Sequence, residues 1–270
     1  MIDRVCISIN NRCNLSCKYC HFREKEALST REMDVFKILD HVKQYAKESF
    51  KIGFVGDGES FLDWSKLKSY ISYLDGWSNI SIYTITNGTI RLPDSELEYL
   101  KKRNVNVGFS LDGYKELHDL NRCGSFDKVM GNVEHYKQII GHYPTFNATV
   151  GKESIENAAK VIAFFQPFGT RVTFSRMIGK NGITLSEYHA FLAEAEKSIP
   201  VRRGGLDCTM YGGLCGAGKN NYYFANGNVY YCGNCIDLPP VGPSDMPFEE
   251  LEKISLVFDR THCYKESICV

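Results

Sequence analysis

The sequence lacks an excess of charge of either sign, a long apolar run and a recognisable leader. Its 32 Lys and Arg residues balance 32 Asp and Glu residues, so the formal net charge is zero. Domains that hold nucleic acid through its phosphates usually carry a clear basic excess, so no nucleic-acid partner is expected. No run of about 18 apolar residues occurs, and the N-terminal residues do not read as a signal peptide, so no membrane partner is expected. We therefore expect a cytoplasmic protein.

What the sequence has in unusual number is cysteine, with 11 in 270 residues. Where thiols stay reduced, clustered cysteines are more often metal ligands or redox groups than disulfides. The odd total also argues against a framework made only of disulfides. Three cysteines crowd the N-terminus and six lie from position 208 onward. We expect Cys6, inside a β-rich run, and the isolated Cys123 to be structural.

Residues 1–200 alternate short β-rich runs with helix-like stretches, against a globular composition of 43% hydrophobic residues. Six strands alternating with six helices predict an α/β fold with parallel βα units, whose ligands gather at the carboxyl ends of the strands. The predicted strands are Arg4–Ile9, Lys51–Val55, Ile80–Thr86, Val105–Leu111, Thr145–Val150 and Arg171–Ser175. The predicted helices begin at a capping box, Ser29 to Glu32, and continue with Asp63–Leu74, Asp94–Lys102, Phe126–Ile140, Ser154–Phe165 and Thr184–Lys197.

Residues 201–270 differ from residues 1–200 in composition and pattern, and we expect them to form a second, small domain. Asn226-Gly227 predicts the turn of a β-hairpin over Asn220–Tyr231, and Phe248–Phe258 reads as a last helix. The segment is too short for a large core of its own. Its six cysteines suggest that a metal centre replaces part of that core, as metals do in small modules.

The sharpest local motif is C-x3-C-x2-C, formed by Cys13, Cys17 and Cys20 directly after the first predicted strand. Three thiolates on one loop suit three irons of a [4Fe–4S] cluster and leave the fourth iron open for a non-protein ligand. Two other interpretations stay open. A zinc site needs a fourth Cys or His, and His21 is adjacent; three buried thiols need no metal at all.

The triplet, with an aromatic residue before its last cysteine, resembles the radical S-adenosylmethionine (SAM) enzymes, and the resemblance covers about residues 4–200. Further motifs follow successive predicted strands. Taken alone, each is also compatible with an ordinary turn or a surface charge, but their order favours the family. They are Gly56-Asp-Gly-Glu59, Thr86-Asn-Gly88, Ser110-Leu-Asp-Gly113, and His118-Asp-Leu-Asn-Arg122 with Gly124-Ser-Phe-Asp127, the last pair resembling the peptide-modifying branch.

The resemblance implies a partial (β/α)6 barrel that binds SAM beside a [4Fe–4S] cluster on the cysteine triplet. Glu59 supplies a carboxylate for an ammonium group, and Arg122 suits a bidentate carboxylate contact. Ser60 stands where the family often has proline, which puts the rigidity of that loop in question. The implied SAM contacts are Tyr19, Gly56, Gly58, Glu59, Asn87, Ser110 and Arg122.

The C-terminal cysteines resemble the SPASM and shorter twitch extensions of such enzymes, through the pattern Cys215-x11-Gly227-x4-Cys232. The resemblance implies an auxiliary [4Fe–4S] cluster, while a zinc knuckle on the same cysteines is the alternative. Cys235 is also a candidate hydrogen donor to a substrate radical. The implied cluster ligands are Cys215, Cys232, Cys263 and Cys269, with Cys208 and Cys235 as alternatives.

The implied function is reductive cleavage of SAM to a 5′-deoxyadenosyl radical, which abstracts a hydrogen atom from a substrate. We expect that substrate to be a peptide, either a ribosomal natural-product precursor or a protein side chain. A reducing partner such as flavodoxin or ferredoxin is also expected. Two alternatives stay open: a radical SAM dehydrogenase or rearrangement enzyme acting on a small molecule, and a non-catalytic iron–sulfur or zinc protein.

Overall fold

The computed structural model describes residues 1–20, 22, 32–177, 182–203, 208, 213–254, 261 and 263. The chain divides into two compact units. Unit 1 comprises Met1–Asn14, His21–Thr84 and Leu214–Val270, and unit 2 comprises Leu15–Cys20 and Ile85–Gly213. No helix within the described ranges is long and apolar enough to cross a membrane.

Unit 1 is a sheet of mostly parallel strands in the order β10-β9-β8-β1-β2-β3. Strands β8, β1, β2 and β3 are parallel neighbours, and β9 and β10 are antiparallel additions at the edge. The strands are β1 (Arg4–Ile7), β2 (Phe50–Phe54), β3 (Ile80–Thr86, of which the last two residues belong to unit 2), β8 (Asn221–Ala225), β9 (Asn228–Tyr230) and β10 (Gly242–Pro243). The helices are α1 (Val35–Tyr45), α2 (Trp64–Tyr73) and α9 (Phe248–Lys253), with short 3-10 turns η2 (Ser60–Asp63) and η5 (Gly233–Cys235).

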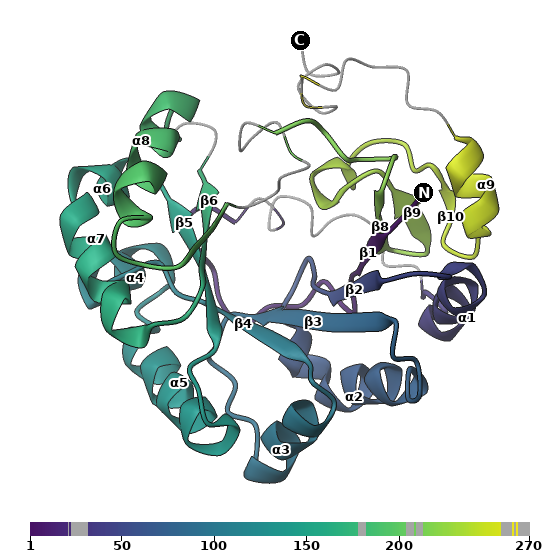
Figure 1. Ribbon diagram of the computed structural model, residues 1–270, viewed down its shortest axis with the longest axis horizontal. Coiled ribbons are helices and arrows are strands. Elements are labelled where there is room, and N and C mark those ends of the chain that lie inside the picture. The colour runs from purple at the N-terminus through teal and green to yellow at the C-terminus, as the bar shows by residue number, and fades with distance from the viewer. Residues whose placement is uncertain are drawn as a thin grey trace. The chain divides into compact units, whose positions relative to one another are not determined.

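One face of this sheet is covered by α1, α2 and α9 (Figure 1). Phe54 stacks on Tyr70 of α2 at 6.0 Å between ring centroids, and Phe224 lies 6.0 Å from Phe248 of α9. Because side chains alternate between the two faces of a strand, the neighbouring positions point away from these helices. That second face carries Cys6 and Tyr83, whose thiol and hydroxyl lie 3.3 Å apart.

Unit 2 contains parallel strands in the order β4-β5-β6-β7, with α5, α6, α7 and α8 along one side of β4–β6 (Figure 1). A continuous series of ring contacts joins the strands and helices of this unit. It runs through Phe146, Phe165, Phe174 and Phe191. The strands are β4 (Asn106–Ser110), β5 (Thr145–Val150), β6 (Val172–Arg176) and β7 (Val201–Arg203). The helices are α3 (Asp94–Lys102), α4 (Lys115–Asn121), α5 (Phe126–Ile140), α6 (Lys152–Glu156), α7 (Ala158–Phe165), η3 (Gln166–Phe168) and α8 (Leu185–Ala195).

The predicted α/β fold of mostly parallel strands is confirmed. The six predicted strands are present, and the hairpin turns at Asn226 and Gly227, whose φ values of 52° and 73° are left-handed as its turn type requires. The capping box of α8 also forms, since Thr184 accepts from the backbone N–H of Glu187, whose carboxylate accepts from Thr184 in return. The division of the chain near residue 200 remains a prediction.

The helices differ from the prediction in four places, apart from shifts of one or two residues at helix ends. Helix α1 begins at Val35, because the Asp34 carboxylate accepts from the backbone N–H of Lys37 at 3.2 Å; Ser29 lies outside the described residues. The single helix predicted for 154–165 is two helices, α6 and α7, separated at Asn157. Helix α4 was not predicted, and the last helix, α9, ends at Lys253 rather than Phe258, which lies outside the described residues.

Candidate SAM and iron–sulfur site

The glycine-containing loop after β2 is held against the chain that leads into the cysteine triplet. The backbone N–H of Glu59 donates to the carbonyl of Arg12 at 2.7 Å, and the Asn10 side chain donates to the carbonyl of Glu59 at 3.2 Å. A Cβ atom on Gly58 would lie only 2.2 Å from the Arg12 carbonyl oxygen. The glycine at this position is therefore required by the chain's own backbone, immediately before Cys13.

The side chain of Glu59 is turned into its own loop. It is 2% exposed, and its Oε1 accepts from the backbone N–H of Phe61 at 2.9 Å, which caps η2. Asp63, at the end of η2, accepts from Asn10 at 2.8 Å and from Arg12 at 2.5 Å. This loop is thus a compact, hydrogen-bonded structure, and the role of Glu59 toward an ammonium group stays a prediction.

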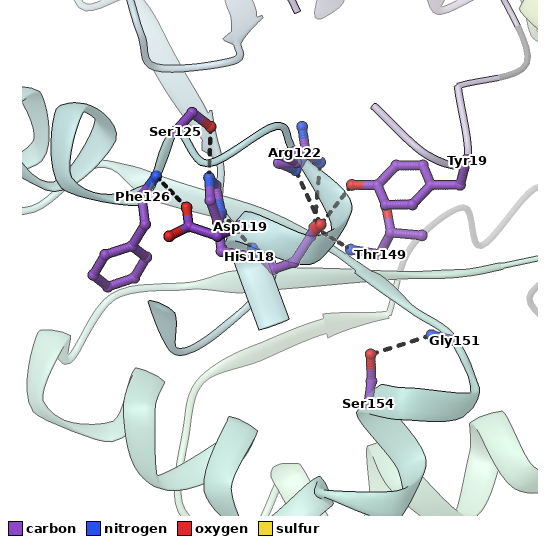
Figure 2. Close-up of polar contacts among 10 residues, drawn as sticks. Tyr19, His118, Asp119, Arg122, Ser125, Phe126, Thr149, Gly151 and Ser154 are labelled. Atoms are coloured by element: carbon purple, nitrogen blue, oxygen red, sulfur yellow. Dashed lines mark hydrogen bonds and ion pairs between the residues drawn. The ribbon is translucent and has the colours of Figure 1, made fainter. Parts of the chain in front are cut away.

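In unit 2, Asp112 is the centre of a buried polar network; Figure 2 labels its partners Tyr19, Arg122 and Thr149. Asp112 lies two positions after the end of β4, and the residue is 1% exposed. It accepts from Arg122 Nε at 3.0 Å and Nη2 at 3.3 Å, from the Tyr19 hydroxyl at 2.7 Å and from the Thr149 backbone N–H at 3.0 Å. A buried carboxylate needs such compensation, since an unpaired charge in the interior is very costly.

The pKa values of the two side-chain donors follow from this pairing. Burial opposes the charged form of Arg122, but the adjacent Asp112 carboxylate outweighs it, so the pKa of the guanidinium is raised. Burial also raises the pKa of Tyr19 well above its ordinary value, so the phenol stays protonated and donates. The Arg122 guanidinium lies 5.4 Å from the Tyr19 ring centroid, which adds a cation–π contact.

The His118 motif contacts the backbone of Asp112 and so extends this network (Figure 2). The Asp112 backbone N–H points to His118 Nδ1 at 3.4 Å, and His118 Nε2 lies 3.0 Å from the Ser125 hydroxyl. Burial lowers the pKa of His118 to about 4, so the ring is neutral near pH 7. Asp119 accepts from the backbone N–H of Phe126 at 2.8 Å, which fixes the turn between α4 and α5.

The second half of the cysteine loop, which carries Cys17 and Cys20, is bound to the end of α4. The Lys18 backbone N–H donates to the carbonyl of Asn121 at 2.9 Å, and the Ser16 backbone N–H donates to the sulfur of Cys123 at 3.3 Å. Cys123 has a left-handed φ of 58°. Together with the bond from Tyr19 to Asp112, these contacts make the loop part of unit 2.

The other predicted SAM contacts lie at strand ends in unit 2. Asn87 is buried, and its side-chain oxygen accepts from the backbone N–H of Thr89 at 2.9 Å and from its hydroxyl at 2.7 Å. Ser110 is the last residue of β4 and is buried. Asp112 itself was not among the predicted site residues, although an aspartate two positions beyond a strand end, ten residues before an arginine, is a signal that points to it.

The predicted metal ligands are brought together only in part. None of the ten described cysteines is in a disulfide, and the sulfurs of Cys232 and Cys235 lie 3.4 Å apart. Cys215 and Cys263 are buried, Cys208 is half-buried, and Cys269 lies outside the described residues. In the part of the chain that is described, no group of three or more His, Cys, Asp or Glu side chains converges as a metal site. Both cysteine ligand sets therefore remain predictions.

Comparison with known proteins identifies the family. A model of the Radical SAM superfamily matches residues 7–195. A cysteine-type anaerobic sulfatase-maturating enzyme of Clostridium novyi (strain NT) is 27% identical over 173 residues, covering 58% of this chain and 46% of that protein. The putative peptide biosynthesis protein YydG of Bacillus subtilis (strain 168) is 26% identical over 237 residues, covering 84% and 68%. The solved structure of native anSMEcpe with bound AdoMet has a TM-score of 0.75 at 23% identity and covers 92% of this chain and 80% of that one. The chain thus spans about half the length of the sulfatase-maturating relative.

The family implies a [4Fe–4S] cluster and SAM, and the residues present fit both groups. The triplet supplies three thiols, outside any disulfide, on one exposed to half-buried loop, and thiolate is the usual ligand of iron in such clusters. The loop after β2 and the Asp112–Arg122 pair are both already ordered by the contacts above.

Substitution of the two loop glycines tests whether the loop is fixed by the chain before Cys13. In Gly58→Ala the new methyl group meets backbone atoms of Arg12, whereas in Gly56→Ala the nearest atom is the Ser8 side-chain oxygen at 3.2 Å. We expect the free energy of unfolding to fall by about 3 kcal/mol for Gly58→Ala and by about 1 kcal/mol for Gly56→Ala, measured by urea denaturation. Equal losses in the two variants would contradict this account.

The low pKa of His118 predicts an acid-dependent loss of stability. The unfolded chain protonates this histidine near its ordinary pKa of about 6.5, but the folded chain does so only near pH 4, so the unfolded state gains protons first as the pH falls. The free energy of unfolding therefore decreases as the pH falls from about 6.5 to about 4, and the decrease reaches about 2 kcal/mol at pH 5. Urea denaturation at several pH values should show that the free energy of unfolding decreases less steeply with falling pH in His118→Asn than in the parent. An equally steep decrease in both proteins would mean that a group other than His118 causes the loss of stability.

Proposed function

This chain belongs to the radical SAM superfamily, and from that premise we propose that it cleaves SAM reductively and removes a hydrogen atom from a peptide substrate. When bound, the reduced cluster and SAM supply a 5′-deoxyadenosyl radical. We assign the cluster to Cys13, Cys17 and Cys20. The observation that carries the proposal is the order of the cysteine triplet, the glycine loop and the buried Asp112–Arg122 pair after successive strands, in a chain that matches the family model.

We assign the remaining SAM contacts as follows. The loop of Gly56, Gly58 and Glu59 receives the amino group, and Ser110 and Arg122 receive the carboxylate. Arg122 is already fixed by Asp112, so its guanidinium loses little side-chain entropy when a second anion arrives. Neutral His118 keeps Asp112 oriented without adding a charge. Tyr19 would border the adenine, and Asn87 completes the site at the end of β3.

We infer a peptide substrate from the names of the relatives, a sulfatase-maturating enzyme and a peptide biosynthesis protein. We further propose that residues 201–270 form a twitch-like module, with an auxiliary [4Fe–4S] cluster on Cys215, Cys232, Cys263 and Cys269. We propose Cys235, which is buried beside Cys232, as the donor of a hydrogen atom to a substrate radical; the resulting thiyl radical would take one electron from the reducing partner and a proton. A small flavodoxin or ferredoxin would supply the electrons.

The first test is SAM cleavage by anaerobically reconstituted, dithionite-reduced protein. We expect 5′-deoxyadenosine and methionine as products, detected by chromatography and mass spectrometry. Cys17→Ala should abolish cleavage, because two thiolates hold a cluster poorly. Cys123→Ser is the matched control, since it removes a nearby thiol outside the triplet, keeps an acceptor for the Ser16 backbone N–H and should retain cleavage. Full turnover by Cys17→Ala would overturn the assignment.

The second test concerns the auxiliary cluster. With two four-iron clusters, iron content should approach about eight per chain, and the triple variant Cys13/Cys17/Cys20→Ala should keep about four. Replacing Cys215 or Cys232 should remove these and expose the segment after residue 200 to protease, because metal binding stabilises small modules. Cys235→Ala should leave the iron count unchanged while altering the product. One zinc and no iron in the triple variant would establish a zinc-stabilised tail instead.

A further inference from the structure

A part-buried hydrogen bond links the C-terminal hairpin to the glycine loop. The hydroxyl of Tyr223, on β8, donates to Oδ1 of Asp57 at 2.5 Å, across 166 positions of the sequence. Asp57 is the residue between the two glycines of the loop after β2. This bond therefore joins the segment assigned to the SAM amino group with a strand that lies beyond residue 200.

The position of Tyr223 is fixed by the sheet of unit 1. Strand β8 pairs parallel with β1, which places Tyr223 beside Cys6, and Cys6 in turn lies beside Gly53 of β2. Directly paired residues share a face, so Tyr223 points away from the helix-covered face, on the side where Tyr83 contacts Cys6.

The ring of Tyr223 is also enclosed. It is 6% exposed and packs in a cluster with Ala225, Tyr230 and Ile236. A Cβ atom on Gly233 would lie 3.1 Å from the ring, so the chain after the hairpin passes close to it. Burial and the Asp57 carboxylate raise the pKa of Tyr223 well above its ordinary value, and the phenol stays protonated as a donor.

The loop is held on its other sides by β1 and the chain that follows it. The Asp57 backbone N–H points to the Ser8 hydroxyl at 3.4 Å, and Glu59 is bound to Arg12 as described above. Tyr223 supplies a hydrogen bond that comes from the C-terminal segment. A charge-assisted hydrogen bond from a rigid ring limits the conformations of a loop that contains two glycines.

We propose that Tyr223 is a positioning residue for SAM, which acts by holding Asp57 and with it the backbone of the loop in the conformation that receives the amino group. The inference rests on the proposed function, because it takes this loop as part of the SAM site. It gives the C-terminal hairpin a role in the first site that does not depend on any metal in the hairpin.

Tyr223→Phe tests the proposal by removing one hydroxyl and keeping the ring. We expect the Kd for SAM, measured by isothermal titration of the reconstituted protein, to rise about tenfold, the lower range for a hydrogen bond to a charged group. Iron content and melting temperature should stay close to those of the parent. Tyr230→Phe, in the same cluster but without a bond to Asp57, is the matched control and should bind SAM as the parent does.

A double-mutant cycle separates positioning from general stabilisation. If the bond carries the effect, Tyr223→Phe should weaken SAM binding no further when Asp57 is already Ala. Asp57→Asn keeps an oxygen acceptor and should bind SAM more tightly than Asp57→Ala, a comparison that holds even if Tyr223→Phe folds poorly. Parent-like affinity in Tyr223→Phe, or independent effects in the cycle, would overturn the proposal. Absence of SAM binding by the parent would instead sink the proposed function, and the inference with it.

Discussion

The carboxylate of Asp112 in unit 2 is almost wholly shielded from water, and a carboxylate in that position needs hydrogen-bond donors. Its donors come from three separate segments: Tyr19 of the cysteine loop, Arg122 at the end of α4 and the backbone of Thr149 on β5. Losing one partner of a buried pair typically costs about 3–5 kcal/mol, so these segments are stable only when assembled together. The cysteine loop is therefore ordered by the same charge that holds Arg122.

Periodic segments of the sequence predicted the fold well, and non-local pairings could not be predicted from it. Strand β3 and helix α5 have the predicted bounds because their apolar residues repeat cleanly. The start of α1 was wrong because a Ser-x-x-Glu pattern occurs by chance, whereas Asp34 directly precedes the apolar positions of the helix. The pairing of β8 with β1 leaves no local pattern, since a hairpin motif does not specify which distant strand lies beside it.

Motif spacing predicted the candidate site residues, but the contacts that these residues make emerged only from packing. Gly58 was predicted to admit a ligand, but a Cβ atom at this position would first meet a backbone oxygen of Arg12. Arg122 was predicted to meet a SAM carboxylate, and its partner in this structure is Asp112. Asp112 was missed although its spacing from the end of β4 and from Arg122 pointed to it. Tyr223 was missed because a side chain that holds another in place has no spacing rule, and its burial is revealed only after the chain is folded.

The pairing of β1 with β8 also determines the order in which parts of the sheet can form during synthesis. Unit 2 is drawn mainly from the continuous stretch Ile85–Gly213, whereas Arg4 meets its neighbour Asn221 only after 217 further positions have been translated. At about 5–20 residues per second, that interval is roughly 10–40 s. Throughout it, one edge of β1 presents unpaired backbone N–H and C=O groups, the kind of edge that invites pairing with other chains. Protection of this first strand on the nascent chain is therefore a requirement separate from the stability of the finished sheet.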